Sequence, residues 1–404
     1  MDIQIKENKY DIDLKDLIVM ASRANNEKRN FLFVSKILGK HIEVSPDICR
    51  IIGYMLATLT CEKNAYTQEI IEAFKKQNDS YKEYFKTEYI CKDRIAVLGF
   101  AETATGLGMA VASAIKDSVY LTTTRENIED MKSILKFEEE HSHATTHKCY
   151  LEELSILKSK DRIILVDDEI TTGKSMLNII EELKVVTGIN KYTILSVLDW
   201  RNEEYLEMYK QFKLEKNVDI DVLSLISGSI KNSDNIVYYD KDESTINERI
   251  EVIDISGDFN KKSHDTLEGK KENYLKDTGR FGVAYEDIVS IEENSRKAAK
   301  KIKKIIGEYK KVLILGHGEN IYIPSRIASY MGGNVKFKTT TRSPIYCKDE
   351  EGYPILEKHS FDDRGVKYYF YNKSSIEKEY DKVVLIIETD LDIKLTNNIA
   401  IFRI

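Results

Sequence analysis

Three segments of the chain share one pattern: an apolar run of strand length, a turn of small residues, and then a helical pattern. They cover residues 94–115, 161–184 and 311–331. Parallel strands need a long crossover connection, which is usually a helix. Strand–turn–helix units in succession therefore predict an α/β fold with a mostly parallel sheet and flanking helices.

The chain is expected to divide into consecutive parts. Residues 1–24 predict a short lead-in with one weakly amphipathic helix over 16–24, and residues 25–255 form the first α/β domain. Residues 256–280 are rich in Lys, Asp, Asn and Gly without periodicity, which is typical of an inter-domain linker. Residues 281–404 open with a basic amphipathic helix and form a second α/β domain.

The second domain is expected to be a degenerate copy of part of the first. Residues 94–128 align with residues 311–345 without a gap, at an offset of 217 (311 − 94). This offset places the run TTTR at 122–125 over an identical run at 339–342. Chance could produce the apolar part of the match, but a four-residue identity at the same offset favours a duplicated unit.

Composition excludes several classes of protein. Hydrophobic residues make up 42% of the chain, which excludes wholesale disorder, and a net charge of −7 gives no general attraction to nucleic acid or acidic membranes. No apolar stretch is long enough to span a bilayer, and the N-terminus lacks the apolar core of a signal peptide, so a cytoplasmic location is expected. The five cysteines are odd in number and contain no CxxC pair, which predicts reduced thiols.

The most specific signal is the run IILVDDEITTGKS at residues 163–175. Its four apolar residues predict a buried strand that ends in Asp167 and Asp168, at the edge where open α/β sheets bind ligands. The following turn opens a helix, and its N–H groups, with the hydroxyls of Thr172 and Ser175, form an anion site. This combination suits a sugar phosphate. The turn would hold its 5′-phosphate, and the carboxylates would accept from its ribose hydroxyls and help to hold Mg²⁺.

This run has two other interpretations. A Walker A loop requires glycine at position 168, which is Asp168 here, so a P-loop NTPase is disfavoured. A purely structural turn leaves the two carboxylates at the end of the strand without a purpose.

Two shorter signals follow other predicted strands. The run GFAETATG at 99–106 is rich in small residues that allow a backbone to approach a ligand closely, although such a run taken alone usually indicates tight packing. Thr124 and Arg125 lie at the end of another strand, where the guanidinium could neutralise an anion. In isolation, a surface ion pair is the better interpretation of Arg125.

Three histidines gather between residues 137 and 147, in the sequence FEEEHSHATTH. With Cys149 they match the spacing H-x-H-x3-H-x-C, which is conceivable for a metal site. The neighbouring acidic residues and the loop context suit neither a zinc knuckle nor a helix-borne site.

With these motifs in this order, the chain resembles the type I phosphoribosyltransferases of bacterial tellurite-resistance (Ter) stress operons. These proteins pair a phosphoribosyltransferase domain with a C-terminal domain named for a Thr-Arg-Ser-Pro motif, TRSP. The resemblance rests on GFAETATGLG, FEEEHSHATTH and VDDEITTGKS in the first half and on TRSP at 341–344 in the second. It covers most of residues 25–404.

The resemblance implies the type I phosphoribosyltransferase fold and transfer of ribose 5-phosphate from phosphoribosyl diphosphate (PRPP) to a base-like acceptor, with release of pyrophosphate. It implies Mg²⁺ as cofactor, with Asp167 and Asp168 as its ligands. The implied catalytic residues are Arg125, Asp167, Asp168 and Thr171. The implied PRPP-binding residues are Ala101, Glu102, Thr103, Ala104, Thr105, Asp167, Asp168, Thr171, Thr172, Gly173, Lys174 and Ser175.

In the same family order, residues 126–147 correspond to a mobile hood that closes over PRPP and excludes water. His141 and His143 are the candidates in this hood for contact with the substrate.

The sequence departs from familiar relatives in two places. Better-known purine enzymes carry Asp where this chain has Thr171, so the site resembles the orotate type and a purine acceptor is disfavoured. In the second half, VVLIIETDLD at 383–392 stands where the PRPP motif should recur, without a TTGKS turn. That domain is therefore not a second PRPP site, and Glu319 and Arg342 are its candidates for a different ligand. A structural pair between Glu319 and Arg342 is the alternative.

An enzyme is the expectation, and a non-catalytic module that senses PRPP or a nucleotide is the alternative from another class. A scaffold for enzymes of the same operon is compatible with either. The expected partners are PRPP and an unidentified base-like acceptor, with no nucleic acid and no membrane. A homodimer is the statistical default.

Overall fold

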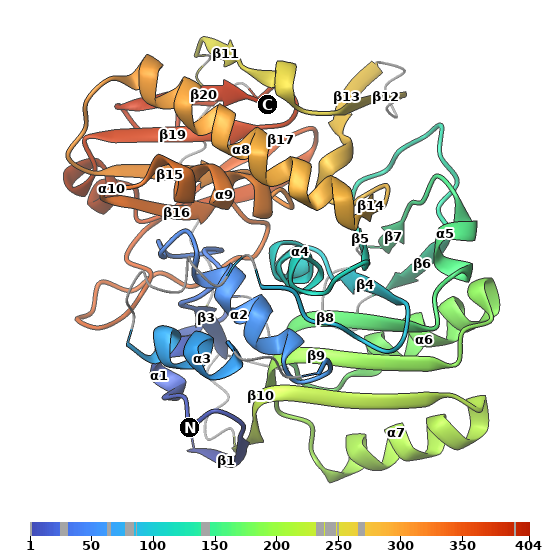
Figure 1. Cartoon of the computed structure of the whole chain (residues 1–404). Coiled ribbons are helices and arrows are strands. Elements are labelled where there is room, and N and C mark those ends of the chain that lie inside the picture. The colour runs from blue at the N-terminus through green and yellow to red at the C-terminus, as the bar shows by residue number, and fades with distance from the viewer. Residues whose placement is uncertain are drawn as a thin grey trace. The chain divides into compact units, whose positions relative to one another are not determined.

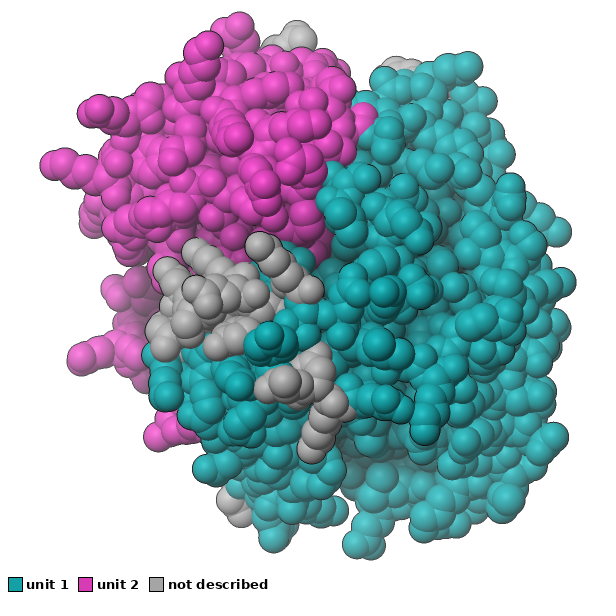
Figure 2. Space-filling model, in the orientation of Figure 1, with its two compact units in different colours: residues 1–12, 49–231, 260–290 teal, residues 13–48, 232–259, 291–404 magenta. Residues whose placement is uncertain are grey.

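The computed structural model describes residues 2–24, 31–62, 66–76, 85, 87–138, 146–231, 238, 248, 250–265, 271–391 and 393–404. The chain forms two compact units, coloured separately in Figure 2. Unit 1 comprises residues 1–12, 49–231 and 260–290, and unit 2 comprises residues 13–48, 232–259 and 291–404. Each unit is thus assembled from three stretches, whereas the sequence analysis expected consecutive domains.

Unit 1 is built on a seven-stranded sheet whose strand order is β1-β10-β9-β8-β4-β5-β14. The five inner strands run parallel, and β1 and β14 pair antiparallel at the two edges (Figure 1). In sheet order the strands are β1 (Asp2–Asn8), β10 (Asp219–Lys231), β9 (Lys191–Asp199), β8 (Arg162–Ile170), β4 (Ile95–Gly99), β5 (Val119–Thr122) and β14 (Val283–Ala284). Every residue of β4 and β5 is buried, as expected for parallel strands covered on both faces.

Helices follow the parallel strands of unit 1 in the expected alternation. The helices of this part of the chain are α2 (Ile48–Ala57), α3 (Thr67–Lys75), α4 (Ala104–Ala114), α5 (Leu154–Lys158), α6 (Lys174–Thr187) and α7 (Glu203–Lys216). Two antiparallel hairpins complete the unit: β6 (Leu135–Glu138) with β7 (Thr146–Cys149), and β12 (Lys261–Asp265) with β13 (Lys271–Leu275). The predicted α/β class with a mostly parallel sheet is confirmed.

Unit 2 has its own five-stranded sheet, with the order β11-β20-β19-β15-β16 and all strands parallel. These strands are β11 (Val252–Asp254), β20 (Ile399–Arg403), β19 (Lys382–Ile387), β15 (Val312–Gly316) and β16 (Val335–Thr339). Other elements of unit 2 include the hairpins β2 (Ile18–Ser22) with β3 (Phe31–Ser35) and β17 (Lys358–Asp363) with β18 (Val366–Tyr371), and the helices α1 (Leu14–Leu17), α9 (Tyr322–Met331) and α10 (Lys373–Glu379). The basic helix α8 (Tyr285–Ile306) begins in unit 1 and continues in unit 2.

The internal repeat predicted from the sequence is confirmed in the fold. At the offset of 217, β4 falls on β15, α4 on α9, and β5 on β16. The sheet neighbours agree as well, since β8-β4-β5 in unit 1 corresponds to β19-β15-β16 in unit 2. Unit 2 therefore reproduces three neighbouring strands of the unit 1 sheet and the helix between two of them.

Most of the segment expected to be a linker belongs to unit 1. Lys261–Asp265 and Lys271–Leu275 pair as strands β12 and β13, and Tyr274 and Phe281 pack with Ile128 and Tyr150 in a small apolar cluster. The polar composition of this stretch hid the cluster, because only a few aromatic residues build it.

Two expectations about the first hundred residues are wrong. Residues 16–24 do not form a helix: α1 ends at Leu17, and Ile18–Ser22 pair antiparallel with Phe31–Ser35, which suits the β-branched residues at 18 and 19. The cysteines are not all reduced, because Cys61 and Cys91 form a disulfide across a sequence separation of 30. A hydrogen bond from Glu62 N to Ile90 O (3.4 Å) brings the two segments together.

Candidate functional site

Three of the predicted site segments lie at one edge of the unit 1 sheet. In the parallel register, Gly99 at the end of β4 pairs with Val166 of β8 and with Thr122 of β5. Backbone hydrogen bonds continue past the strands, from Phe100 N to Val166 O (3.2 Å) and from Thr123 N to Gly99 O (3.0 Å). The loop after β4, the acidic end of β8 and the TTTR run after β5 are therefore neighbours at the carboxyl edge, where α/β folds bind ligands.

The loop after β4 leads directly into helix α4, and its residues 101–105, of which the last two begin the helix, are buried and closely packed. Ala101 N donates to Thr123 Oγ1 (2.8 Å), and Thr105 Oγ1 donates to Glu102 O (3.0 Å). The peptide bond between Ala101 and Glu102 is cis. A side chain at Gly99 would lie 2.6 Å from Ala104 O, so glycine is required where α4 crosses the end of β4.

The acidic pair lies within the strand rather than after it, since β8 continues to Ile170. Asp167 and Asp168 are half-buried, and Asp168 N donates to Asp167 Oδ1 (2.9 Å). Strand β8 therefore presents both carboxylates near its carboxyl end.

The TTGKS turn opens helix α6, as predicted. Gly173 has φ +72°, a left-handed conformation that favours glycine, and α6 begins at Lys174. Lys174 N donates to Thr172 Oγ1 (3.3 Å), and residues 171–175 are all half-buried. The turn thus precedes a helix N-terminus, which is the positive end of the helix dipole, and its role in binding an anion stays a prediction.

Tyr209 of α7 supports this turn, and no pattern in the sequence indicated this role. Its hydroxyl donates to Gly173 O (2.8 Å), and the Arg201 guanidinium lies 4.3 Å from the ring centroid. Burial raises the pKa of Tyr209, so the hydroxyl remains a donor at neutral pH. Arg201 is in turn paired with Asp199 (2.7 Å) at the end of β9.

Arg125 lies between the loop and the hairpin β6–β7. Its Nη1 is 3.7 Å from Glu102 Oε2, and its Nε donates to His147 Nε2 (3.2 Å). His147 is fully buried, and its Nδ1 lies 3.3 Å from Thr123 Oγ1. Thr123 and His147 are thus parts of the site that the sequence analysis did not assign, although Thr123 belongs to the repeated TTTR run.

His141 and His143, proposed for the hood, lie outside the described residues. Of residues 126–147, the structure describes 126–138 and 146–147. No cluster of three or more His, Cys, Asp or Glu side chains that could bind a metal occurs in the described part of the chain.

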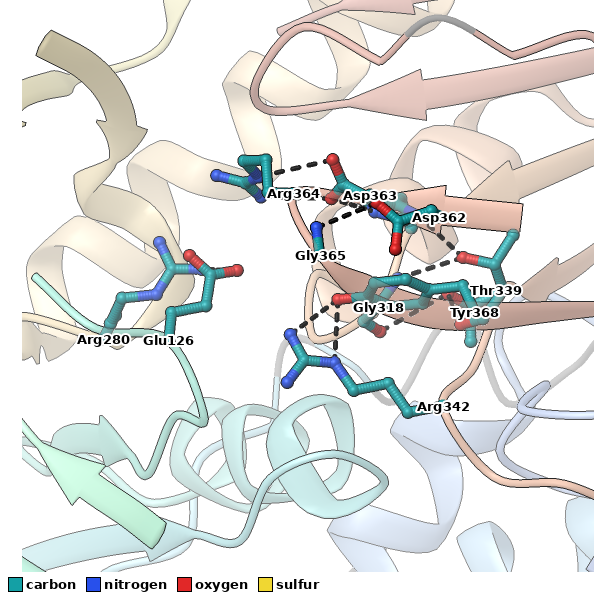
Figure 3. Close-up of polar contacts among 12 residues, drawn as sticks. Glu126, Arg280, Gly318, Thr339, Arg342, Asp362, Asp363, Arg364, Gly365 and Tyr368 are labelled. Carbon is teal, nitrogen blue, oxygen red and sulfur yellow. Dashed lines mark hydrogen bonds and ion pairs between the residues drawn. The ribbon is translucent and has the colours of Figure 1, made fainter. Parts of the chain in front are cut away.

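The repeated edge of unit 2 carries a different polar cluster (Figure 3). Arg342 donates from Nε (2.9 Å) and Nη2 (2.7 Å) to Tyr368 Oη. Glu319, which follows β15, is buried. His317 bridges Thr340 Oγ1 (2.8 Å) and Asp363 Oδ2 (3.1 Å). Burial raises the pKa of Asp363, but hydrogen bonding to His317 and the charge of Arg364 outweigh this effect and lower the pKa to about 2.

Comparison with known proteins agrees with these features. Residues 17–229, more than half of the chain, match the family described as "Phosphoribosyl transferase", and residues 277–401 match the "TRSP domain C terminus to PRTase_2". Two curated relatives are hypoxanthine/guanine phosphoribosyltransferases. That of Methanosarcina mazei is 31% identical over 105 residues, covering 26% of this chain and 52% of the relative, and that of Methanosarcina barkeri is 29% identical over 119 residues, covering 30% and 59%. The chain thus spans only slightly more than half the length of these relatives.

Among solved structures, the adenine phosphoribosyltransferase of Trypanosoma brucei has 14% identity and a TM-score of 0.33, over 54% of this chain and 80% of that one. The enzyme of Rhodothermus marinus has 13% identity and a TM-score of 0.29, over 52% and 94%.

None of the helices described here combines the length and the apolar character that crossing a membrane requires. The two family matches cover the site segments of unit 1 and the repeated edge of unit 2 alike. The chain belongs to this phosphoribosyl transferase family and carries its C-terminal TRSP domain.

Proposed function

We propose that the protein is a PRPP-dependent phosphoribosyltransferase that moves ribose 5-phosphate to a base-like acceptor and releases pyrophosphate. The observation that carries the proposal is the meeting of the acidic pair, the TTGKS turn, the loop 101–105 and Arg125 on adjacent strands of one sheet edge. A member of this family with that arrangement has the groups that a sugar diphosphate requires.

The two ends of PRPP need different partners. The turn 171–175 offers N–H groups, hydroxyls and the positive end of the α6 dipole, which suit the 5′-phosphate. Asp167 and Asp168 are carboxylate acceptors, which suit the ribose hydroxyls. The small residues of loop 101–105 allow the backbone to approach the pyrophosphate.

Arg125 is the proposed electrostatic catalyst. Negative charge grows on the pyrophosphate as its bond to the ribose C1′ breaks and the acceptor nitrogen attacks that carbon. A guanidinium can bind such oxygens with two parallel hydrogen bonds, and it keeps its charge throughout. The side chain of Arg125 is 14% exposed, so this charge acts in a partly desolvated setting, where it has more effect than in water.

Asp167 and Asp168 fit a magnesium ion. Both are half-buried carboxylates at a ligand-binding edge, and Mg²⁺ in proteins is usually bound through one or two carboxylates and the phosphates of the substrate. When bound, the ion would neutralise charge on the pyrophosphate.

For the acceptor, two features of the chain favour different bases. The curated relatives are named hypoxanthine/guanine phosphoribosyltransferases. Thr171, by contrast, is the residue that favours an orotate-type acceptor over a purine. The acceptor is therefore proposed only as a base-like heterocycle, and a panel containing both classes decides between them.

The proposal includes further features that the sequence expectations support. Arg342 and Glu319 are proposed to bind a second ligand in unit 2, where Arg342 already has the phenol of Tyr368 as an acceptor. A role in stress operons of the tellurite-resistance type, a cytoplasmic location, a homodimer and operon partners complete the proposal.

Calorimetric titration with PRPP and Mg²⁺ tests the site. Asp168→Asn removes one carboxylate charge and Thr172→Ala removes one hydroxyl, and each should abolish measurable binding without unfolding the protein. Asp221→Asn is the control, because Asp221 is an exposed carboxylate near the amino end of parallel strand β10 and should leave affinity unchanged. Wild-type affinity in both site variants would sink the proposal.

A further inference from the structure

His147 connects two parts of the candidate site that come from different strands. Arg125 Nε donates to its Nε2, and its Nδ1 faces Thr123 Oγ1, which also accepts from Ala101 N. The ring therefore lies between the arginine that follows β5 and the backbone of the loop that follows β4.

The protons of this chain of contacts can be assigned. Arginine remains protonated in proteins, so Arg125 Nε–H must be the donor and His147 Nε2 must be an acceptor without a proton. The neutral ring then carries its proton on Nδ1, which donates to Thr123 Oγ1 at 3.3 Å. Every contact thus has one donor and one acceptor, and the orientation of the ring is fixed from both sides.

Unit 2 contains the same frame with a different acceptor. Gly318 N donates to Thr340 Oγ1 (3.3 Å), as Ala101 N does to Thr123 Oγ1 in unit 1. Arg342 Nε donates to Tyr368 Oη (Figure 3). Arg125 Nε donates in the same way to His147 Nε2 in unit 1.

The two acceptors also occupy matching places in the chain. His147 directly precedes Lys148, which bridges to Thr124, and Tyr368 directly precedes Tyr369, which bridges to Thr341. Two different side chains thus supply the acceptor at one structural position, which indicates that the arginine after the TTT run requires one.

We propose that His147 is a positioning residue for PRPP binding: it orients the Arg125 guanidinium and couples it to the loop of residues 101–105. This inference rests on the proposed function of that site. His147 acts through Arg125 and Thr123, because it is itself fully buried.

Substitution of His147 by glutamine or by asparagine distinguishes the two contacts of the ring. Glutamine places its carbonyl oxygen where Nε2 lies and can still accept from Arg125, whereas asparagine reaches only the Nδ1 position and can bind Thr123 alone. His147→Gln should keep PRPP affinity within about twofold of wild type. His147→Asn and His147→Leu should weaken it roughly tenfold, as expected for loss of a hydrogen bond from a charged donor.

The calorimetric assay is accompanied by thermal unfolding of each full-length variant. A merely structural role for His147 would make affinity follow the melting temperature, and Asn and Gln would then behave alike. Equal affinity of the Asn variant and the wild type would overturn the proposal, as would equal losses in the Asn and Gln variants.

A second readout does not depend on PRPP. Imidazole ¹⁵N NMR of the full chain, with the His147→Gln spectrum identifying the signal among seven histidines, should show a neutral ring protonated on Nδ1. A proton on Nε2 of His147 would contradict the proposed hydrogen bond from Arg125, whatever ligand the protein binds. A wild type that shows the expected ring but does not bind PRPP would refute the proposed function and leave the orientation of Arg125 by His147 established.

Discussion

Two glycines at opposite ends of helix α6 provide a matched test of the phosphate turn. Gly173 precedes the helix with φ +72°, and Gly188 follows it with φ +79°. A Cβ at Gly173 would lie 2.9 Å from Cε2 of Tyr209 and closer still to its hydroxyl, whereas a Cβ at Gly188 has no heavy atom within 4 Å. Alanine at either position adopts the same unfavourable backbone region, but only Gly173→Ala also collides with a neighbour.

The difference in stability can be worked out from these contacts. The left-handed conformation costs alanine about 1–2 kcal/mol at either position, so this cost cancels between the two variants. Alanine also lowers the conformational entropy of the unfolded chain, and this stabilising effect cancels in the same way. At Gly173 the displaced Tyr209 adds about 1–3 kcal/mol of overpacking, with loss of a hydrogen bond of about 1 kcal/mol. Gly173→Ala should therefore lower the free energy of unfolding by about 2–4 kcal/mol more than Gly188→Ala.

Urea unfolding measures this difference, and calorimetry with PRPP measures its effect on the site. Only Gly173→Ala should weaken PRPP binding, because only that substitution moves the turn that begins α6. Equal unfolding free energies and equal PRPP affinities for the two variants would refute the role assigned to Tyr209 and the turn.

Two further predictions concern stability. Arg326 is buried in unit 2 between Asp47 (2.5 Å) and Glu292 (3.0 Å). Arg326→Met removes the guanidinium that both carboxylates contact and should cost about 3–5 kcal/mol in urea unfolding, and a loss below about 1 kcal/mol contradicts this. Burial raises the pKa of Asp277 from 3.8 to about 6. Between these pH values the unfolded chain releases a proton that the folded chain retains. The free energy of unfolding should therefore fall as pH rises through this range, by about 3 kcal/mol in total. Asp277→Asn should remove this part of the pH dependence, and an unchanged profile in that variant would show that Asp277 is not its source.

The sequence predicted those features that depend on local pattern. The run at 163–175 has the apolar strand, the turn residues and the helix start of β8 and α6 within one short segment. The TTTR repeat predicted the duplicated edge because both copies keep identical residues at a single offset. Parallel strands end at one edge, which predicted the end of β8 as a ligand-binding edge, but no pattern in the sequence indicated that β4 lies between β8 and β5.

What escaped prediction depends on contacts between distant residues. Tyr209 reaches Gly173 from a helix 36 residues away, and nothing in its own segment distinguishes it from another helical tyrosine. His147 could be interpreted only as part of a histidine cluster, since its partners Thr123 and Arg125 lie before the hairpin. The disulfide between Cys61 and Cys91 likewise has no local spacing signal.

The central claim is tested most directly by pyrophosphate release from PRPP and Mg²⁺ in the presence of hypoxanthine, guanine, adenine or orotate. The proposed function predicts release above the background of PRPP hydrolysis with at least one of these bases, and no such release by Asp168→Asn. Tight PRPP binding without base-dependent release from any of them would contradict the transferase and favour a PRPP sensor.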